Sequence, residues 1–303
     1  VVQNVAVGAE ADRRFPYLRE KEVRPLPAEI LGEICRNVQA MLLHRIGTVA
    51  VFNTDNLLIS KFVGVVSAGL YSNYMMIRGF LNLLINALFD AIAPGLGSLA
   101  ATETEEHRRT AFRRLHFFSA WLFGWMSICL FCLYDPFIDI WLGEGYLLPK
   151  KAVLLIVLNF YVNSMRIPVN NTKGVLGLFW EDRYKSILEA VSNLAVSAVL
   201  AQRWGVEGII AGTLISTLAF PFWWKPLVLY RRGLHSPADK YFADYLAHLG
   251  VTVAAGWATW LLCRGIGGGI GCFLLKYLLC AALPNAIYIV AYRQKEELHF
   301  FLH

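Results

Sequence analysis

Residues 115–134 read LHFFSAWLFGWMSICLFCLY, and this stretch decides the fold class. It is rich in Trp, Phe and Leu, and it has one titratable group near its start, His116. About 20 consecutive, mostly apolar residues are what an α-helix needs to cross the hydrocarbon core of a bilayer. The stretch therefore predicts a transmembrane helix.

The composition of the whole chain points the same way. Of the 303 residues, 57% are apolar and 17% are charged, and the mean hydropathy is +0.49. Soluble domains average about 25% charged residues. So few charges exclude a disordered chain and a nucleic-acid binder that depends on dense charge. A soluble α/β enzyme is disfavoured, because these charges could not cover the surface of so much apolar volume.

Seven further segments are long and apolar enough to cross a bilayer. Three of them are as clear as residues 115–134, and they are 206–224, 245–263 and 270–291. Four others carry polar residues at helical spacing, and they are 36–62, 67–98, 152–175 and 185–202. The sequence therefore predicts an all-α integral membrane protein with about eight transmembrane helices.

The basic residues fall mainly on one set of alternating loops. The net charge is +6, and of the 28 Lys and Arg residues 18 lie on the side of the first residues, 5 on the opposite side and 5 within spans. Cytoplasmic loops carry an excess of Lys and Arg. This split predicts a multi-pass protein with both ends in the cytoplasm, and it explains the basic excess without a nucleic-acid partner.

Polar side chains recur at helical spacing in four of the predicted spans. A charge at membrane depth costs at least about 2.5–3.5 kcal/mol, so such groups are functional candidates. Steps of three or four residues place each row on one side of its helix. The rows are Arg45, Thr48, Phe52 and Asp55; Tyr71, Tyr74, Arg78, Asn82, Asn86 and Asp90; Asn159, Asn163, Arg166 and Asn170; and Glu189, Asn193 and Ser197. Four rows on neighbouring helices predict a shared, water-filled cavity.

Arg78 and Arg166 are the strongest binding candidates, because each lies mid-row with no acidic residue four positions away. A guanidinium offers forked donors to phosphate oxygens, and Arg45 is the third candidate for this task. The alternative is structural, since Asn and Ser side chains also join membrane helices through hydrogen bonds. In that alternative, Arg78 pairs with Asp55 across helices.

The sequence predicts neither a metal site nor a catalytic site. The seven histidines have no metal-ligand spacing. Cys129 and Cys132 lie one turn apart in an apolar helix without flanking His or Asp, which is typical of two small packing residues. No Ser, His and Asp arrangement converges, and residues 135–151, where the outer acidic residues gather, are too few for a catalytic domain. An enzyme is therefore disfavoured.

Several blocks of the chain resemble one family. They are FNTDNLLISKFVG (52–64), AGLYSNY (68–74), GLFWEDRYKSILE (177–189) and WGVEGIIAGT (204–213). Together they resemble the second lobe of bacterial polysaccharide exporters of the O-antigen and teichoic-acid flippase type, over roughly residues 36–292. This family belongs to the multidrug/oligosaccharidyl-lipid/polysaccharide exporter superfamily. Its members have two helical lobes around a central cavity and flip lipid-linked oligosaccharides across the bacterial plasma membrane by alternating access.

The resemblance implies a division of the chain into three parts. Residues 1–35 are expected to form a cytoplasmic linker and an interfacial helix that starts near Pro27. Residues 36–232 correspond to the second transporter lobe with six transmembrane helices, and residues 233–303 to an additional helix pair and a cytoplasmic tail. The first lobe is then a missing N-terminal part of the same protein, and it would be needed for transport.

The resemblance also implies roles for the polar residues. The arginines would attract the pyrophosphate of an undecaprenyl-pyrophosphate-linked glycan. The amides that could hydrogen-bond sugar hydroxyls are Asn82, Asn159 and Asn163. Asp55 would orient an arginine or carry a coupling cation, H⁺ or Na⁺, and no other cofactor is expected. The partners are then the lipid-linked substrate and the membrane lipids.

Two other functions stay open at this point. A drug/cation antiporter of the same superfamily would favour a cavity rich in carboxylates and aromatic residues, whereas these rows mix Arg with Asn. A membrane-embedded glycan polymerase or glycosyltransferase would need a long outer loop or a carboxylate-rich cytoplasmic domain, and the sequence has neither.

Overall fold

The computed structural model describes residues 2–19, 27–102, 104–178, 180–182 and 184–302. Two compact units divide the chain, Val1–Gln39 and Ala40–His303, and each is described by itself. Within the described residues the chain is almost entirely helical and has no β-strand, which confirms the predicted all-α class.

The helices follow one another with short connections. Their bounds are α1 Val2–Arg14, α2 Ala28–Phe62, α3 Val65–Thr102, α4 Glu105–Leu142, α5 Lys150–Ser164, α6 Ile167–Val175, α7 Lys185–Ala219, α8 Pro221–Val228, α9 Asp239–Cys263, α10 Ile270–Tyr292 and α11 Glu296–Leu302. The first unit holds α1 and the start of α2, and the second unit holds the remainder.

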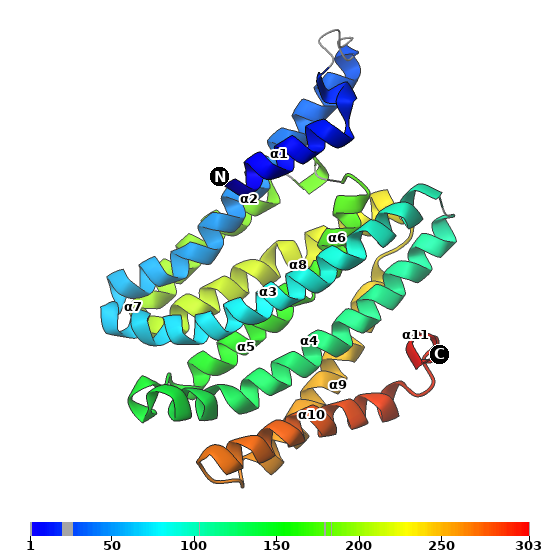
Figure 1. The fold of residues 1–303 in the computed structure, drawn as a ribbon. Helices are drawn as coiled ribbons and strands as arrows, with labels where there is room; N and C mark the ends of the chain where they lie inside the picture. The colour runs from blue at the N-terminus through cyan, green and yellow to red at the C-terminus, as the bar shows by residue number, and fades with distance from the viewer. Residues whose placement is uncertain (1, 20–26, 103, 179, 183, 303) are drawn as a thin grey trace. The chain divides into compact units, whose positions relative to one another are not determined.

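Helix α4 contains residues 115–134 and is shared by the two hydrophobic cores of the second unit. Thr104 caps its first turn by accepting a hydrogen bond from the amide of His107 at 3.5 Å, and Glu105 and Glu106 follow where the helix dipole favours negative charge. One core lies mainly between α3, α4, α5 and α7 and the other between α4, α9 and α10. Figure 1 shows α9 and α10 along one side of α4 and α3 and α5 along the other.

Helix α7 folds back on itself at Gly205. This residue has φ 55° and ψ −128°, a backbone conformation that interrupts the helix and that L side chains rarely adopt. Hydrogen bonds then join the two arms: the Asn193 side chain donates to Thr213 Oγ1 at 2.8 Å, and the Ser197 hydroxyl donates to the Ile209 carbonyl at 3.1 Å. Residue 193 pairs with 213 and residue 197 with 209, so the two arms run antiparallel and form a helical hairpin.

Small residues let the two arms of the hairpin touch. A Cβ added to Gly208 would meet the Leu200 carbonyl, and one added to Gly212 would meet the Ser197 side chain and backbone. Glycines four positions apart allow membrane helices to approach this closely. The hairpin agrees with the predicted division of this segment into two spans on either side of residues 204–205.

Six helical segments of the described residues are long and apolar enough to cross a membrane. They are Val65–Ser98, Glu105–Leu142, Lys150–Val175, Lys185–Gly233, Asp239–Cys263 and Ile270–Tyr292. Because Lys185–Gly233 folds back, the six account for seven of the eight predicted spans, and the remaining one, residues 36–62, lies in α2. Large apolar side chains such as Phe80, Trp257 and Leu278 are at least 61% exposed. A surface of this kind suits lipid, and the chain is a multi-pass membrane protein.

Candidate functional site

A break between α5 and α6 positions the first residue of the site. α5 ends at Ser164 and α6 begins at Ile167, with Arg166 at the N-terminal boundary of α6. Pro168 has no amide hydrogen, so it cannot donate to the carbonyl of Ser164 one turn earlier, and the continuous helix ends there. The Arg166 carbonyl then accepts the first hydrogen bond of α6, from the amide of Asn170 at 2.9 Å. The interruption brings the Arg166 side chain to a cavity instead of to a regular helix face.

This cavity has a volume of about 370 Å³. Its walls come from α3, α5, α6, α7 and α8, which lie in the second unit. The lining residues are Arg78, Asn82, Asn86, Asn163, Ser164, Arg166, Ile167, Asn170, Glu189 and Lys225. A cavity of this size fits a compact polar group, since ligand pockets commonly have volumes of about 300–1,000 Å³.

Arg166 is held by a carboxylate from another helix. Its two terminal nitrogens donate to the two carboxylate oxygens of Glu189 at 2.9 and 3.2 Å, and one of them also donates to the Asn163 side chain at 2.8 Å. Thr217 donates a further, long hydrogen bond to Glu189 at 3.4 Å. The prediction considered only acidic residues on the helix of Arg166 itself. The neutralising group lies 23 residues further along the chain.

Lys225 adds a second buried cation to the cavity. Its side chain is 8% exposed, and its ammonium donates to the Asn170 side chain at 2.5 Å. Together with Arg78 and Arg166, the cavity has three basic residues against one acidic residue, Glu189. The formal charges of these four residues sum to +2, an excess of basic groups that favours anions.

Helix α3 contributes Arg78, Asn82 and Asn86 to one wall. These three residues come from the polar row that was predicted for the second span, and they face the cavity together. Their spacing of four residues places them on one side of α3. The structure thus brings four of the seven candidate residues to one cavity, namely Arg78, Asn82, Asn163 and Arg166.

Asp55 takes part in helix contacts and is not a lining residue of this cavity. Its carboxylate accepts from Thr213 at 2.9 Å and from Tyr71 at 3.3 Å, and it is 7% exposed. Asn193 in turn donates to Thr213, so the chain of hydrogen bonds joins α2, α3 and both arms of α7. These contacts are of the helix-joining kind that the structural alternative describes. The pairing of Arg78 with Asp55 stays a prediction.

Asn159 is likewise placed between helices. It is 2% exposed, and its side-chain nitrogen donates to the Ile210 carbonyl at 3.0 Å, which joins α5 to α7. Its neighbour Asn163 is the member of this row that reaches the cavity. Arg45 lies in α2, and its side chain is outside the described part of the chain.

A model of the family described as "Polysaccharide biosynthesis protein" matches residues 20–149. The predicted resemblance to polysaccharide flippases is confirmed. The match includes α2, α3 and α4, and therefore the cavity wall that carries Arg78. No curated protein matches the chain.

A solved structure described as "Lipid II flippase MurJ, inward closed conformation" has the same fold. The TM-score is 0.57 at 14% sequence identity, and the match covers 84% of this chain and 52% of that chain. The chain thus spans about half the length of the flippase structure that it matches. At this identity the likeness establishes the helical architecture.

Two charged residues of the cavity, Glu189 and Lys225, were not among the predicted substrate-binding residues. Glu189 heads a polar row at spacings of four, so the signal was present in the sequence. Lys225 lies between Trp224 and Pro226 near a helix end, where a lysine usually extends its ammonium to water. Only the packing of α8 against α6 and α7 turns Lys225 inward.

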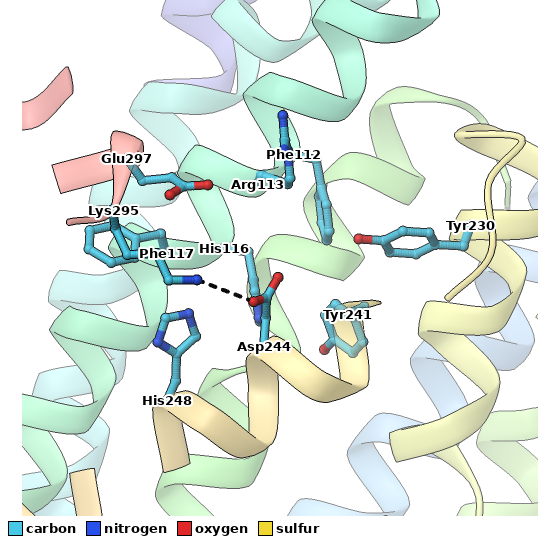
Figure 2. A pocket seen from close by; sticks show the side chains of 10 residues that line it. All are labelled: Phe112, Arg113, His116, Phe117, Tyr230, Tyr241, Asp244, His248, Lys295 and Glu297. Atoms are coloured by element: carbon cyan, nitrogen blue, oxygen red, sulfur yellow. Dashed lines mark hydrogen bonds and ion pairs between the residues drawn. The ribbon is translucent and has the colours of Figure 1, made fainter. Parts of the chain in front are cut away.

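A second, smaller cavity of about 20 Å³ lies between α4, α9 and the start of α11. Figure 2 shows His116 of α4 near Tyr241 and His248 of α9, with the ion pair between Lys295 and Asp244 at its edge, where the two atoms are 3.5 Å apart. This volume admits about one water molecule. The cavity is therefore too small for a saccharide or a phosphate group.

Proposed function

We propose that this chain forms part of a transporter that moves a lipid-linked saccharide across a bacterial plasma membrane. The observation that carries the proposal is the cavity with three basic residues and one carboxylate inside a helical membrane protein. The family match and the fold of a lipid II flippase support the same function. Both comparisons favour a transporter over an enzyme.

The basic residues suit the phosphate groups of such a substrate. The guanidinium groups of Arg78 and Arg166 supply paired donors that fit phosphate oxygens, and the Lys225 ammonium supplies a compact charge. The first turn of α6 adds to this, because Ile167 and Asn170 line the cavity at a helix N-terminus, the positive end of the helix dipole. Interrupted helices of transporters commonly bind anionic substrate groups in this way.

The amide side chains suit the sugar. Asn82, Asn86 and Asn163 line the cavity beside the basic residues, and an amide can both donate to and accept from a sugar hydroxyl. We propose that the cavity binds the pyrophosphate and the first sugar of an undecaprenyl-linked glycan, while the lipid chain stays in the bilayer. Asn159 and Arg45 remain predicted contributors of the complete transporter.

The composition of the cavity also supports the choice among transporters. A drug/cation antiporter would need an excess of carboxylates to bind cations, whereas basic residues are in excess here. A coupling ion, H⁺ or Na⁺, stays part of the proposal, with Asp55 as its candidate ligand. Both chain ends are proposed to lie in the cytoplasm, as the distribution of Lys and Arg predicts.

The test is complementation of bacteria that lack their own lipid-linked oligosaccharide flippase, with the protein expressed at its full natural length. We expect export to be lost in the double variant Arg78→Ala/Arg166→Ala and to be kept in part by the double Lys variant. Lys240→Ala, at an exposed position in the first turn of α9, is the matched control. Undiminished export by the Ala double variant, at wild-type protein level in the membrane, would overturn the proposal. Gain of drug resistance without glycan export would favour the antiporter instead.

A further inference from the structure

Three buried cysteines from three different helices meet at one point, away from the candidate site. They are Cys132 of α4, Cys263 of α9 and Cys280 of α10, and their sulfur atoms all lie within 4.8 Å of one another. Their exposed fractions are 7%, 4% and 0%, and all three are free thiols. The chain has only six cysteines, so half of them converge here.

The backbone carbonyl of Cys280 is hydrogen-bonded to α4 instead of to its own helix. Pro284 lies four residues after Cys280 and has no amide hydrogen, so the Cys280 carbonyl receives no hydrogen bond from its own helix. That carbonyl instead accepts from the indole of Trp125 at 2.9 Å and from the thiol of Cys129 at 3.7 Å. Both donors belong to α4, so Cys280 is held against the helix that supplies Cys132.

From this geometry we propose that Cys132, Cys263 and Cys280 bind one thiophilic divalent metal ion of the Zn²⁺ class. A Zn–S distance of about 2.3 Å places three sulfur ligands about 3.8–4.0 Å apart. The three thiols lie within 4.8 Å before any adjustment, so shifts of less than about 1 Å bring them into that range. Soft thiolate ligands select Zn²⁺ over Mg²⁺ and Ca²⁺. On binding, each thiol releases a proton and becomes a thiolate.

The charge balance favours a divalent ion. Three thiolates and one Zn²⁺ leave a net charge of −1 in an apolar environment, where an uncompensated charge is costly. Lys276 lies one helical turn before Cys280 on α10. Its ammonium would bring the total to zero. With a monovalent ion such as Cu⁺, the three thiolates and the Lys276 ammonium would still leave a charge of −1. Lys276 is not a lining residue of the candidate site, and its proposed role is to balance the charge of this metal site.

The site would join the additional helix pair to the transporter lobe. Cys263 and Cys280 belong to α9 and α10, whereas Cys132 belongs to α4, which Figure 1 shows between this pair and α3 and α5. A metal ion held by all three helices would prevent the pair from separating from α4. None of the three cysteines lines the candidate site, so the metal-site proposal does not depend on the proposed transport activity.

The test uses Co²⁺ as a spectroscopic substitute for Zn²⁺, added to the purified full-length protein in reducing buffer. We expect one Co²⁺ per chain, with a thiolate-to-cobalt charge-transfer band that added Zn²⁺ abolishes. Cys132→Ser and Cys280→Ser are each expected to weaken binding at least about 100-fold, and Lys276→Met about 10-fold. Cys272→Ser, on the same helix α10 but outside the cluster, is the matched control and should bind like the wild type.

A second readout separates metal binding from folding. Co²⁺ should raise the Tm of the wild type and of Cys272→Ser, but not that of Cys132→Ser. Without metal, all three proteins should have the same Tm and the same elution volume in size-exclusion chromatography. If the wild type with all thiols reduced gives no charge-transfer band, the proposal is wrong. It is also wrong if Cys132→Ser and Cys280→Ser keep the band.

Discussion

The carboxylate of Glu189 accepts two hydrogen bonds from the guanidinium of Arg166, at 2.9 and 3.2 Å, across 23 residues of sequence. The Arg166 and Glu189 side chains are only 14% and 8% exposed, yet both line the cavity. Under the proposed function, a phosphate group that enters the cavity must compete with Glu189 for Arg166. Glu189 would then limit how tightly the cavity holds an anion, which suits a transporter because it must also release its substrate.

Replacing Glu189 by its isosteric amide should strengthen anion binding. Glu189→Gln removes the competing charge and raises the net charge of the lining residues from +2 to +3. We expect undecaprenyl pyrophosphate to bind about tenfold more tightly, which corresponds to about 1.4 kcal/mol, and its release to slow. The measurement is quenching of tryptophan fluorescence in detergent-solubilised protein. Glu144→Gln, an exposed position in the 144–146 turn, should leave affinity unchanged, and equal affinities of wild type and Glu189→Gln would contradict the competition.

Lys225 should be required for export through its charge. Lys225→Met keeps the length of the side chain but removes the ammonium that donates to Asn170 at 2.5 Å. We expect at least about a tenfold loss of export in the complementation assay, since a charge-assisted hydrogen bond contributes about 1.5–3 kcal/mol. Lys225→Arg should retain part of the activity because it retains the charge. Full export by Lys225→Met would show that this lysine does not contact the substrate.

The hairpin of α7 should not tolerate a side chain at Gly212. A Cβ there would overlap Ser197 on the opposite arm, and neither backbone can move without opening the hairpin. Gly212→Val should lower the free energy of unfolding by about 1–3 kcal/mol, the usual cost of overpacking. Unfolding in mixed detergent micelles with increasing SDS measures this difference. Gly250→Val serves as the control, because nothing lies within 4 Å of a Cβ at Gly250.

The two buried histidines beside the small cavity should respond in opposite directions to replacement by phenylalanine. Neither ring nitrogen of His116 has a hydrogen-bond partner among the described residues, whereas His248 shares a hydrogen bond of 2.8 Å with Tyr292. An unsatisfied buried polar group costs about 1–3 kcal/mol. His116→Phe should therefore raise the Tm, and His248→Phe should lower it. Equal shifts in one direction would contradict this account. Figure 2 shows the positions of the two histidines beside the small cavity.

Much of the candidate site could be predicted because helical periodicity is a local property. Arg78, Asn82 and Asn86 recur every four residues, and this spacing alone places them on one side of α3, whichever neighbours that helix has. The turn at Gly205 was predictable for a similar reason, since two apolar segments of sufficient length flank it. The pairing of Arg166 with Glu189 was not, because it depends on which helices lie side by side.

The amides of the predicted rows show the same limit. Asn159 and Asn163 belong to one row at a spacing of four, yet Asn159 donates to the Ile210 carbonyl while Asn163 lines the cavity. A row has one direction along its helix, but neighbouring helices cross it at an angle, so successive members meet different surroundings. Spacing can nominate such residues, and only packing separates the structural member from the cavity-lining one.

The sequence by itself determined the fold class, the number of apolar spans to within one, a family resemblance and the helix faces that carry polar groups. These properties depend on the spacing of side chains a few residues apart and on how favourably each segment transfers into lipid. Both are local to one segment and do not depend on which helices pack against it. Only the tertiary structure decided which charges neutralise one another and which residues converge. Cys132, Cys263 and Cys280 have no recognisable spacing, because each comes from a different helix, and a three-helix contact leaves no periodic signal in the chain.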